Sequence, residues 1–123
     1  MKLQLAGRDG LNTFTAYGAD YVSVNGVPYR QNLAVLPDRL IPGWTTATFA
    51  TLTLDDFVAL AALDAQIVLL GTGDALRFPR PELLQPLVAA QKGIEIMDLR
   101  AACRTYNMLA SEGRRVVAGL LLA

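Results

Sequence analysis

Apolar runs alternate with helical patterns between residues 53 and 122, and this alternation restricts the fold more than any other feature of the chain. Residues 66–70 are typical of a strand covered on both faces of a sheet. We expect residues 94–97 to form a further core strand and residues 115–122 a final strand. Because the connections are short and the intervening segments have helical spacing, the sequence predicts a layered α/β domain.

Capping residues indicate where two of the helices begin. Thr53 starts the first helix, and Asp56 stands three residues later in the capping-box position. Asp98 is expected to cap the last helix, which Gly113 should end because glycine readily adopts the left-handed conformation of a helix terminus.

The middle helix is expected to begin at Pro81-Glu82 and to end at Lys92-Gly93. Pro86 should kink or loosen this helix because proline removes a backbone hydrogen bond. The expected buried stripe of this helix consists of Leu83, Leu84, Leu87 and Val88.

A small antiparallel β element is expected in the N-terminal half. Residues 21–24 and 27–30 flank Asn25-Gly26, a dipeptide that supplies the positive φ angles of a tight hairpin turn. Pro28 has no backbone N–H and should therefore lie on an edge strand. Residues 32–36 are expected to be extended as well.

Residues 38–51 are expected to form a loop that leads into a short apolar stretch. Trp44 in this loop is either a plug in the core or an exposed anchor for a partner. We favour the core, because large aromatic side chains are mostly buried.

The length and composition indicate one compact domain over residues 1–123, with 53% hydrophobic residues and a formal net charge of zero. A neutral chain has no global field that would attract nucleic acid, although residues 77–115 carry seven basic and four acidic side chains. Residues 1–8 lack the pattern of a secretory or mitochondrial signal, and every apolar run is too short to span a membrane. We therefore expect a cytoplasmic protein without a membrane span.

The chain has no histidine and one cysteine. This composition excludes histidine-based nucleophile systems, histidine-ligated metals and a cysteine-ligated structural zinc. Cys103 shares one face of the last helix with apolar residues. We favour a buried structural thiol over a redox or nucleophilic one. We expect neither a cofactor nor a bound metal.

One end of the sheet is the candidate site for a ligand or partner. Gly71-Thr72-Gly73 follows an apolar strand, where α/β sheets place their binding crevice. The glycines fit a simple turn better than a dinucleotide fingerprint, because no third glycine follows at the required spacing. If the two core strands are parallel, this loop and the Asp98 helix start emerge at the same edge. Thr72, Arg100 and Arg104, with Arg77 as a further candidate, would then surround a cleft suited to an anion or a peptide carboxylate.

The run from Met97-Asp98 through Cys103-Arg104-Thr105-Tyr106-Asn107 to Glu112-Gly113-Arg114, together with the Gly71-Thr72-Gly73 segment, resembles the Mth-domain family, domain of unknown function 498. The resemblance implies a single three-layer α/β domain with a central mixed sheet flanked by helices. It implies no established enzyme activity. A mitochondrial complex I assembly factor is a member, so the resemblance implies binding to a partner protein.

Two hypotheses of function follow. The first is a non-catalytic domain that binds another protein, which requires an exposed apolar patch that could include Trp44 or Leu99. The second is a binder of a small anionic ligand, or an unrecognised enzyme, that uses Gly71 to Gly73 and Arg100 to Arg104. Neither hypothesis specifies an oligomeric state.

Overall fold

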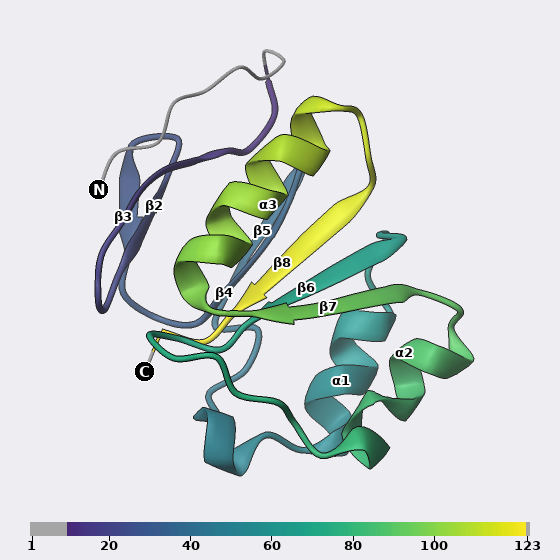
Figure 1. The fold of residues 1–123 in the computed structure, drawn as a ribbon. Coiled ribbons are helices and arrows are strands. Elements are labelled where there is room, and N and C mark those ends of the chain that lie inside the picture. Colours follow the sequence, from purple (N-terminus) through teal and green to yellow (C-terminus); the bar gives the residue numbers. More distant parts are fainter. Residues whose placement is uncertain (1–9, 123) are drawn as a thin grey trace.

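The computed structural model describes residues 10–122, which form eight strands and three α-helices with two 3-10 helices (Figure 1). The elements are β1 (Phe14–Tyr17), β2 (Val22–Val24), β3 (Val27–Tyr29), β4 (Leu33–Leu36), β5 (Arg39–Pro42), η1 (Phe49–Thr51), α1 (Leu54–Ala61), β6 (Ile67–Gly71), η2 (Pro81–Leu84), α2 (Gln85–Ala89), β7 (Gly93–Met97), α3 (Leu99–Ser111) and β8 (Val116–Leu120).

Two sheets carry these strands. The five-stranded sheet has the order β5-β4-β8-β6-β7, and the small sheet has the order β1-β2-β3. β6 is parallel to both β7 and β8, whereas β4 is antiparallel to β5 and β8. The large sheet is therefore mixed, as the resemblance implied, and the small sheet is antiparallel throughout.

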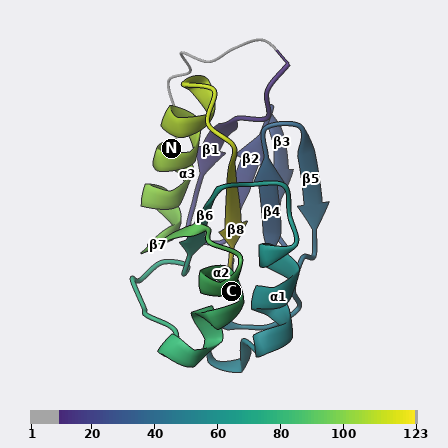
Figure 2. The same cartoon turned by 90° about the vertical axis from the view of Figure 1, so that its right-hand side faces the viewer.

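The five-stranded sheet is the middle layer of a three-layer α/β fold (Figures 1 and 2). Successive side chains of its strands point to opposite faces and pack into two separate hydrophobic cores. On one face, Val68, Leu70 and Val117 pack in a cluster that contains Phe57 of α1 and Leu87 of α2. The other face packs against α3 and the small sheet in a cluster that includes Leu69, Ala118, Tyr106 and Phe14.

The local signals in the sequence are confirmed. Asn25 and Gly26 have φ angles of 53° and 82° in the turn between β2 and β3. The Asp56 carboxylate accepts a hydrogen bond from the backbone N–H of Thr53, which completes the predicted capping box. The Asp98 carboxylate accepts from the backbone N–H of Ala101 at 2.9 Å and caps α3.

Several expectations about the elements were wrong. Residues 39–42 form strand β5 rather than part of a loop, because they pair with β4 across the tight turn at residues 37–38. β7 is an edge strand with several half-exposed or exposed residues rather than a core strand. In the middle helix, Val88 is exposed rather than buried.

Pro86 does not kink a continuous helix. The segment that begins at Pro81 is first a 3-10 helix, and α2 starts anew at Gln85, which places Pro86 in the first turn of α2. A proline there removes an N–H that has no partner within the helix. The expected end at Lys92-Gly93 was also wrong, because α2 ends at Ala89 and Gly93 begins β7. The residue with positive φ between them is Gln91, at 57°.

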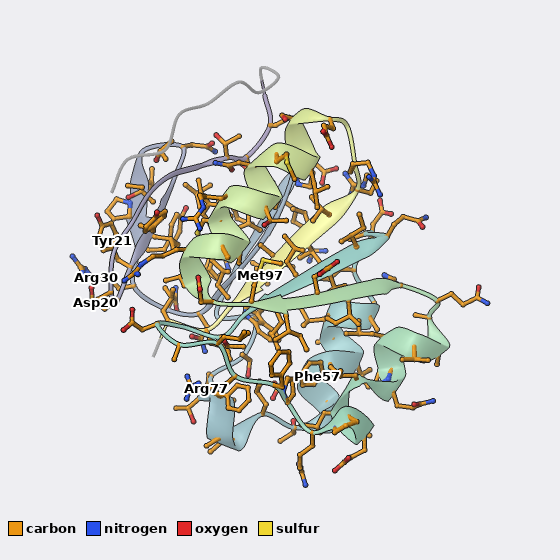
Figure 3. The ribbon with its side chains drawn as sticks, viewed as in Figure 1. Asp20, Tyr21, Arg30, Phe57, Arg77 and Met97 are labelled. Carbon is orange, nitrogen blue, oxygen red and sulfur yellow. The ribbon has the colours of Figure 1, made fainter. Side chains whose placement is uncertain are left out.

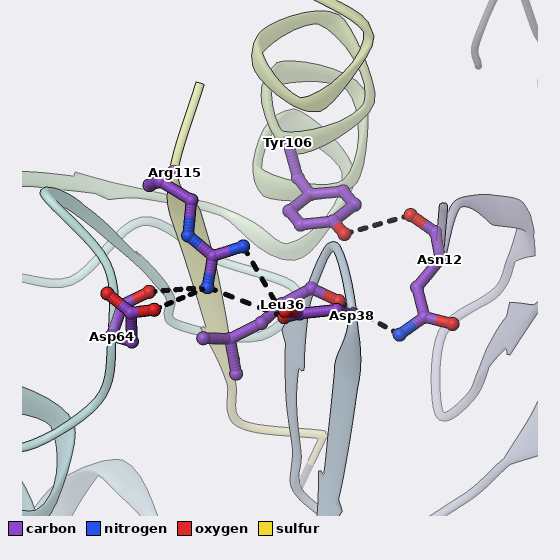
Figure 4. A network of polar contacts seen from close by, with 6 residues as sticks. All are labelled: Asn12, Leu36, Asp38, Asp64, Tyr106 and Arg115. Carbon is purple, nitrogen blue, oxygen red and sulfur yellow. Dashed lines mark hydrogen bonds and ion pairs between the residues drawn. The ribbon is translucent and has the colours of Figure 1, made fainter. Parts of the chain in front are cut away.

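Polar contacts attach the small sheet to the other layers (Figure 4). The Tyr106 hydroxyl of α3 donates to the backbone carbonyl of Asn12 at 2.8 Å, and the Asn12 amide donates to the carbonyl of Leu36 at 2.9 Å. In the same region Arg115 forms ion pairs with Asp38 at 3.4 Å and Asp64 at 3.2 Å. Residues distant in sequence therefore hold one end of the fold together.

Candidate functional site

The loop after β6 meets the start of α3 at one end of the large sheet, as the sequence predicted. The parallel pairing of β6 with β7 places Gly71 beside Met97, one residue before the Asp98 cap. The backbone N–H of Leu99 donates to the carbonyl of Gly73 at 2.8 Å. The first turn of α3 is thereby bonded directly to the loop.

Both glycine positions of the Gly71-Thr72-Gly73 segment favour glycine for a steric reason. A Cβ atom on Gly71 would lie 2.7 Å from a methyl group of Leu120 and 3.2 Å from the Cβ of Ala102. Gly73 has a φ of +90°, which side-chain-bearing residues rarely adopt. The first glycine lets α3 approach the sheet, and the second turns the chain away from β6.

Thr72 is buried, and its hydroxyl organises the following residues. It donates to the carbonyl of Ala75 at 2.7 Å and accepts from the backbone N–H of Arg77 at 3.1 Å. The Arg77 guanidinium donates back to the Thr72 carbonyl at 2.9 Å and lies 4.7 Å from the ring centroid of Phe49. Figure 3 shows Arg77 beside the segment that carries η1. Thr72 and Arg77 therefore clamp the loop from both ends.

The side chains of the remaining predicted site residues also form hydrogen bonds or ion pairs with other residues of the chain. The Asp98 carboxylate caps α3, and Arg100 forms an exposed ion pair with Asp74 at 3.2 Å. Arg104 donates to the Tyr17 hydroxyl of β1 at 3.1 Å, so it bonds the small sheet. The structure gathers the loop and the start of α3 at one sheet end. The polar groups there stabilise the loop and its neighbours.

The clamped loop displays two apolar side chains to solvent. Phe78 is 69% exposed and Leu76 is 50% exposed. A hollow of about 220 Å³ adjoins Phe78, and its lining also includes Phe49, Leu52 and Leu83. We call Leu76, Phe78 and this hollow the Phe78 surface. Sequence reasoning missed it, although two large apolar residues in a segment with neither strand nor helix spacing are a usable signal.

Trp44 and Leu99, the residues suggested for an exposed patch, do not form one. The Trp44 ring packs against the core on the α1 side of the sheet, and its indole N–H donates to the Leu120 carbonyl at 3.0 Å. Leu99 is buried in the core beneath α3. The preference for Trp44 as a core residue is confirmed.

Cys103 is buried among apolar side chains, as its helical position predicted. Burial is the largest influence on its pKa and raises it from 9.0 to about 12, while the nearby Arg104 guanidinium acts in the opposite direction. Burial likewise raises the pKa of Tyr106. A thiol with so high a pKa is almost wholly protonated at neutral pH, which makes it a poor nucleophile or metal ligand.

Within residues 10–122, no cluster of three or more cysteine, aspartate or glutamate residues could hold a metal ion. None of the helices in the same range has the length and apolar character needed to cross a membrane.

The family model described as protein of unknown function (DUF498/DUF598) matches residues 14–121. The chain belongs to this family, and the predicted resemblance to the Mth domain is confirmed. A solved structure from Bordetella pertussis, described as an Mth938-like domain, has a TM-score of 0.78 and 35% sequence identity, and covers 99% of this chain and 92% of its own.

Two further proteins are also similar to this chain. A crystal structure of a Bordetella parapertussis protein has a TM-score of 0.85 and 39% identity, over 93% of this chain and 98% of its own. NADH dehydrogenase [ubiquinone] 1 alpha subcomplex assembly factor 3 of Bos taurus is 29% identical over 86% of this chain. The match spans 58% of that protein's length, so this chain corresponds to little more than half of it.

Proposed function

We propose that this chain is a non-catalytic protein-binding domain and that its partner docks on the Phe78 surface. The observation that carries the proposal is the display of Phe78 and Leu76 on a loop that Thr72 and Arg77 clamp. The name of the cattle relative, an assembly factor, supports a protein partner. We extend the proposal to assistance in assembling a larger complex, in the cytoplasm.

The Phe78 surface favours binding through its exposed apolar area and its ordered backbone. A side chain such as Phe78 gains free energy when a partner removes its ring from water, and aromatic side chains are frequent among the residues that dominate binding energy. The hydrogen bonds of Thr72 already hold the neighbouring backbone, so binding loses little conformational entropy there. The adjoining hollow offers a place for a side chain of the partner.

The test compares Phe78→Ala with Val27→Ala in affinity capture from the native cell, with the recovered protein quantified against the bait. Val27 is a matched control because it is 51% exposed on the small sheet, away from the loop. We expect one protein at constant stoichiometry with the wild type and the control, and a loss of about tenfold or more with Phe78→Ala. Equal recovery with all three proteins would contradict the proposal.

The same preparations test the alternative of a small anionic ligand. Native mass spectrometry of the purified chain would detect a bound acidic molecule, and Arg104→Ala would release it if Arg104 belongs to its site. A stoichiometric molecule that Arg104→Ala removes, with no partner that depends on Phe78, would overturn the protein-binding proposal.

A further inference from the structure

β7 is the strand edge that the described part of the fold leaves open. On the small sheet, the side chain of Asn107 bonds both backbone groups of Phe14 in β1, and β3 contains Pro28. On the large sheet, β5 ends at Pro42. Proline, charged residues and covering side chains are the usual protection of edges against added strands. β7 reads Gly-Ile-Glu-Ile-Met, so it has no proline and its one charged residue is Glu95.

The backbone groups that β7 presents outward can be assigned from its pairing with β6. The N–H of Gly93 donates to Gln66, and the carbonyl of Met97 accepts from Thr72, so both residues face β6. The N–H and C=O of one strand residue point to the same side, and successive residues alternate. Ile94 and Ile96 therefore direct their backbone N–H and C=O groups away from the sheet.

A groove lies beside this edge, between β7 and α3. Its volume is about 520 Å³, and its lining includes Leu69, Met97 and the exposed Met108. Two charged residues, Glu95 and Arg114, also line the groove, and both are exposed. In residues 10–122 neither side chain takes part in an ion pair or a hydrogen bond.

We propose that the β7 edge binds a second copy of this chain, with the two β7 strands antiparallel and Ile94 opposite Ile94 of the second copy. The outward backbone groups of Ile94 then form a hydrogen-bonded pair. The two-fold axis is perpendicular to the sheet, so the two five-stranded sheets become continuous and both α3 helices lie on the same face. The apolar grooves adjoin across the axis.

The charges of Glu95 and Arg114 favour the register in which Ile94 is opposite Ile94 of the second copy. Pairing centred on Glu95 would set two carboxylates opposite each other at Cβ separations of about 5 Å, which is destabilising. Pairing centred on Ile94 sets Glu95 opposite Gly93 of the second copy. Arg114 lies at that end of the sheet, because Gly93 and Val116 are both paired with Ile67. Glu95 of each copy therefore approaches Arg114 of the other, and the symmetry makes this contact twice.

The test is sedimentation velocity over a range of protein concentrations with charge reversals at the two positions. The wild type should dimerise reversibly. Glu95→Arg and Arg114→Glu should each raise the dimer Kd about tenfold or more, because each sets like charges together at two places. The double variant, which restores opposite charges, should return the Kd to within about threefold of the wild-type value.

Glu112→Arg is the matched control, because Glu112 is exposed near the end of α3 and does not line the groove. It should leave the Kd unchanged, and circular dichroism should show that all the variants fold. A wild-type chain that stays monomeric throughout the concentration range would overturn the proposal. So would single reversals without effect, or a double variant as weak as the singles.

Discussion

Asn107 bonds both backbone groups of Phe14. Its side-chain carbonyl accepts from the Phe14 N–H at 2.9 Å, and its amide donates to the Phe14 carbonyl at 2.8 Å. Phe14 in turn packs edge-on against the ring of Tyr106, with the centroids 5.2 Å apart. One residue pair thus attaches the small sheet to α3, ninety-three positions further along the chain.

Asn107→Ala should lower the free energy of unfolding by about 1–3 kcal/mol, because two part-buried backbone groups of Phe14 lose their partners. Urea denaturation followed by circular dichroism measures the change. Ser111→Ala is the control, because the Ser111 hydroxyl bonds only the carbonyl of Met108, within the same helix. An effect of Asn107→Ala no larger than that of the control would show that the contact contributes little.

Gly71→Ala should lower the free energy of unfolding by about 1–3 kcal/mol, because its new methyl group would overlap Leu120 and crowd Ala102. Gly93→Ala provides the comparison: it is also in a strand, and its new Cβ would have no neighbour closer than 3.8 Å. Thermal unfolding should separate the two variants by several degrees. Equal melting temperatures would mean that α3 moves aside freely.

Thr72→Val keeps the shape of the side chain and removes its hydroxyl, so the carbonyl of Ala75 and the N–H of Arg77 lose a partner. We expect a loss of about 1–3 kcal/mol and faster hydrogen exchange at the Arg77 amide. The exposed Thr46 is the control, and Thr46→Val should leave both quantities unchanged. If the Arg77 amide exchanges as slowly in Thr72→Val as in the wild type, the clamp does not depend on this hydroxyl.

Stability should fall as the pH rises above 9. Burial raises the pKa of Cys103 from 9.0 to about 12, so the unfolded chain releases the thiol proton first and binds fewer protons in this range. The stabilisation is complete below pH 9 and is lost progressively up to pH 12. Tyr106, whose pKa is also raised, acts in the same direction.

The free energy of unfolding, measured at several pH values, should therefore fall less steeply with pH in Cys103→Ala than in the wild type. The two slopes should differ by up to about 1.4 kcal/mol per pH unit. The matched helix variant Ser111→Ala should retain the wild-type slope. Identical slopes in Cys103→Ala and the wild type would indicate that the thiol ionises at the same pH in the folded and unfolded chain.

The features that sequence reasoning located are those whose cause is local. The Asn25-Gly26 turn, the Thr53 capping box and the Asp98 cap each depend on residues within four positions of one another. The buried position of Cys103 followed from the spacing of apolar residues along α3.

The features that it missed depend on distant pairing. Residues 39–42 become a strand only because β4 is beside them, and their pattern alone resembles a loop. Nothing near Asn107 in the sequence indicates that Phe14 is its partner. Apolar spacing also does not distinguish an edge strand such as β7 from a central one, because the position within the sheet depends on the order of all five strands.

The sequence predicted which two segments meet at the candidate site, but it did not predict the partners of the arginine side chains there. The loop at Gly71 and the start of α3 meet, whereas Arg77, Arg100 and Arg104 each bond a neighbour within the chain. Which partner an arginine side chain bonds depends on the positions of atoms in the folded chain. Residue types and spacing do not reveal these positions. The large apolar side chains that this loop exposes to solvent are Leu76 and Phe78.

Site-specific photo-crosslinking in the native cell tests most directly whether a partner docks on the Phe78 surface, with a benzophenone amino acid at position 78 and, separately, at position 27. We expect position 78 to crosslink one defined protein in high yield and position 27 not to do so, although both side chains are exposed. Equal labelling at the two positions, or no crosslinked protein at position 78, would contradict the role of the Phe78 surface in binding a partner.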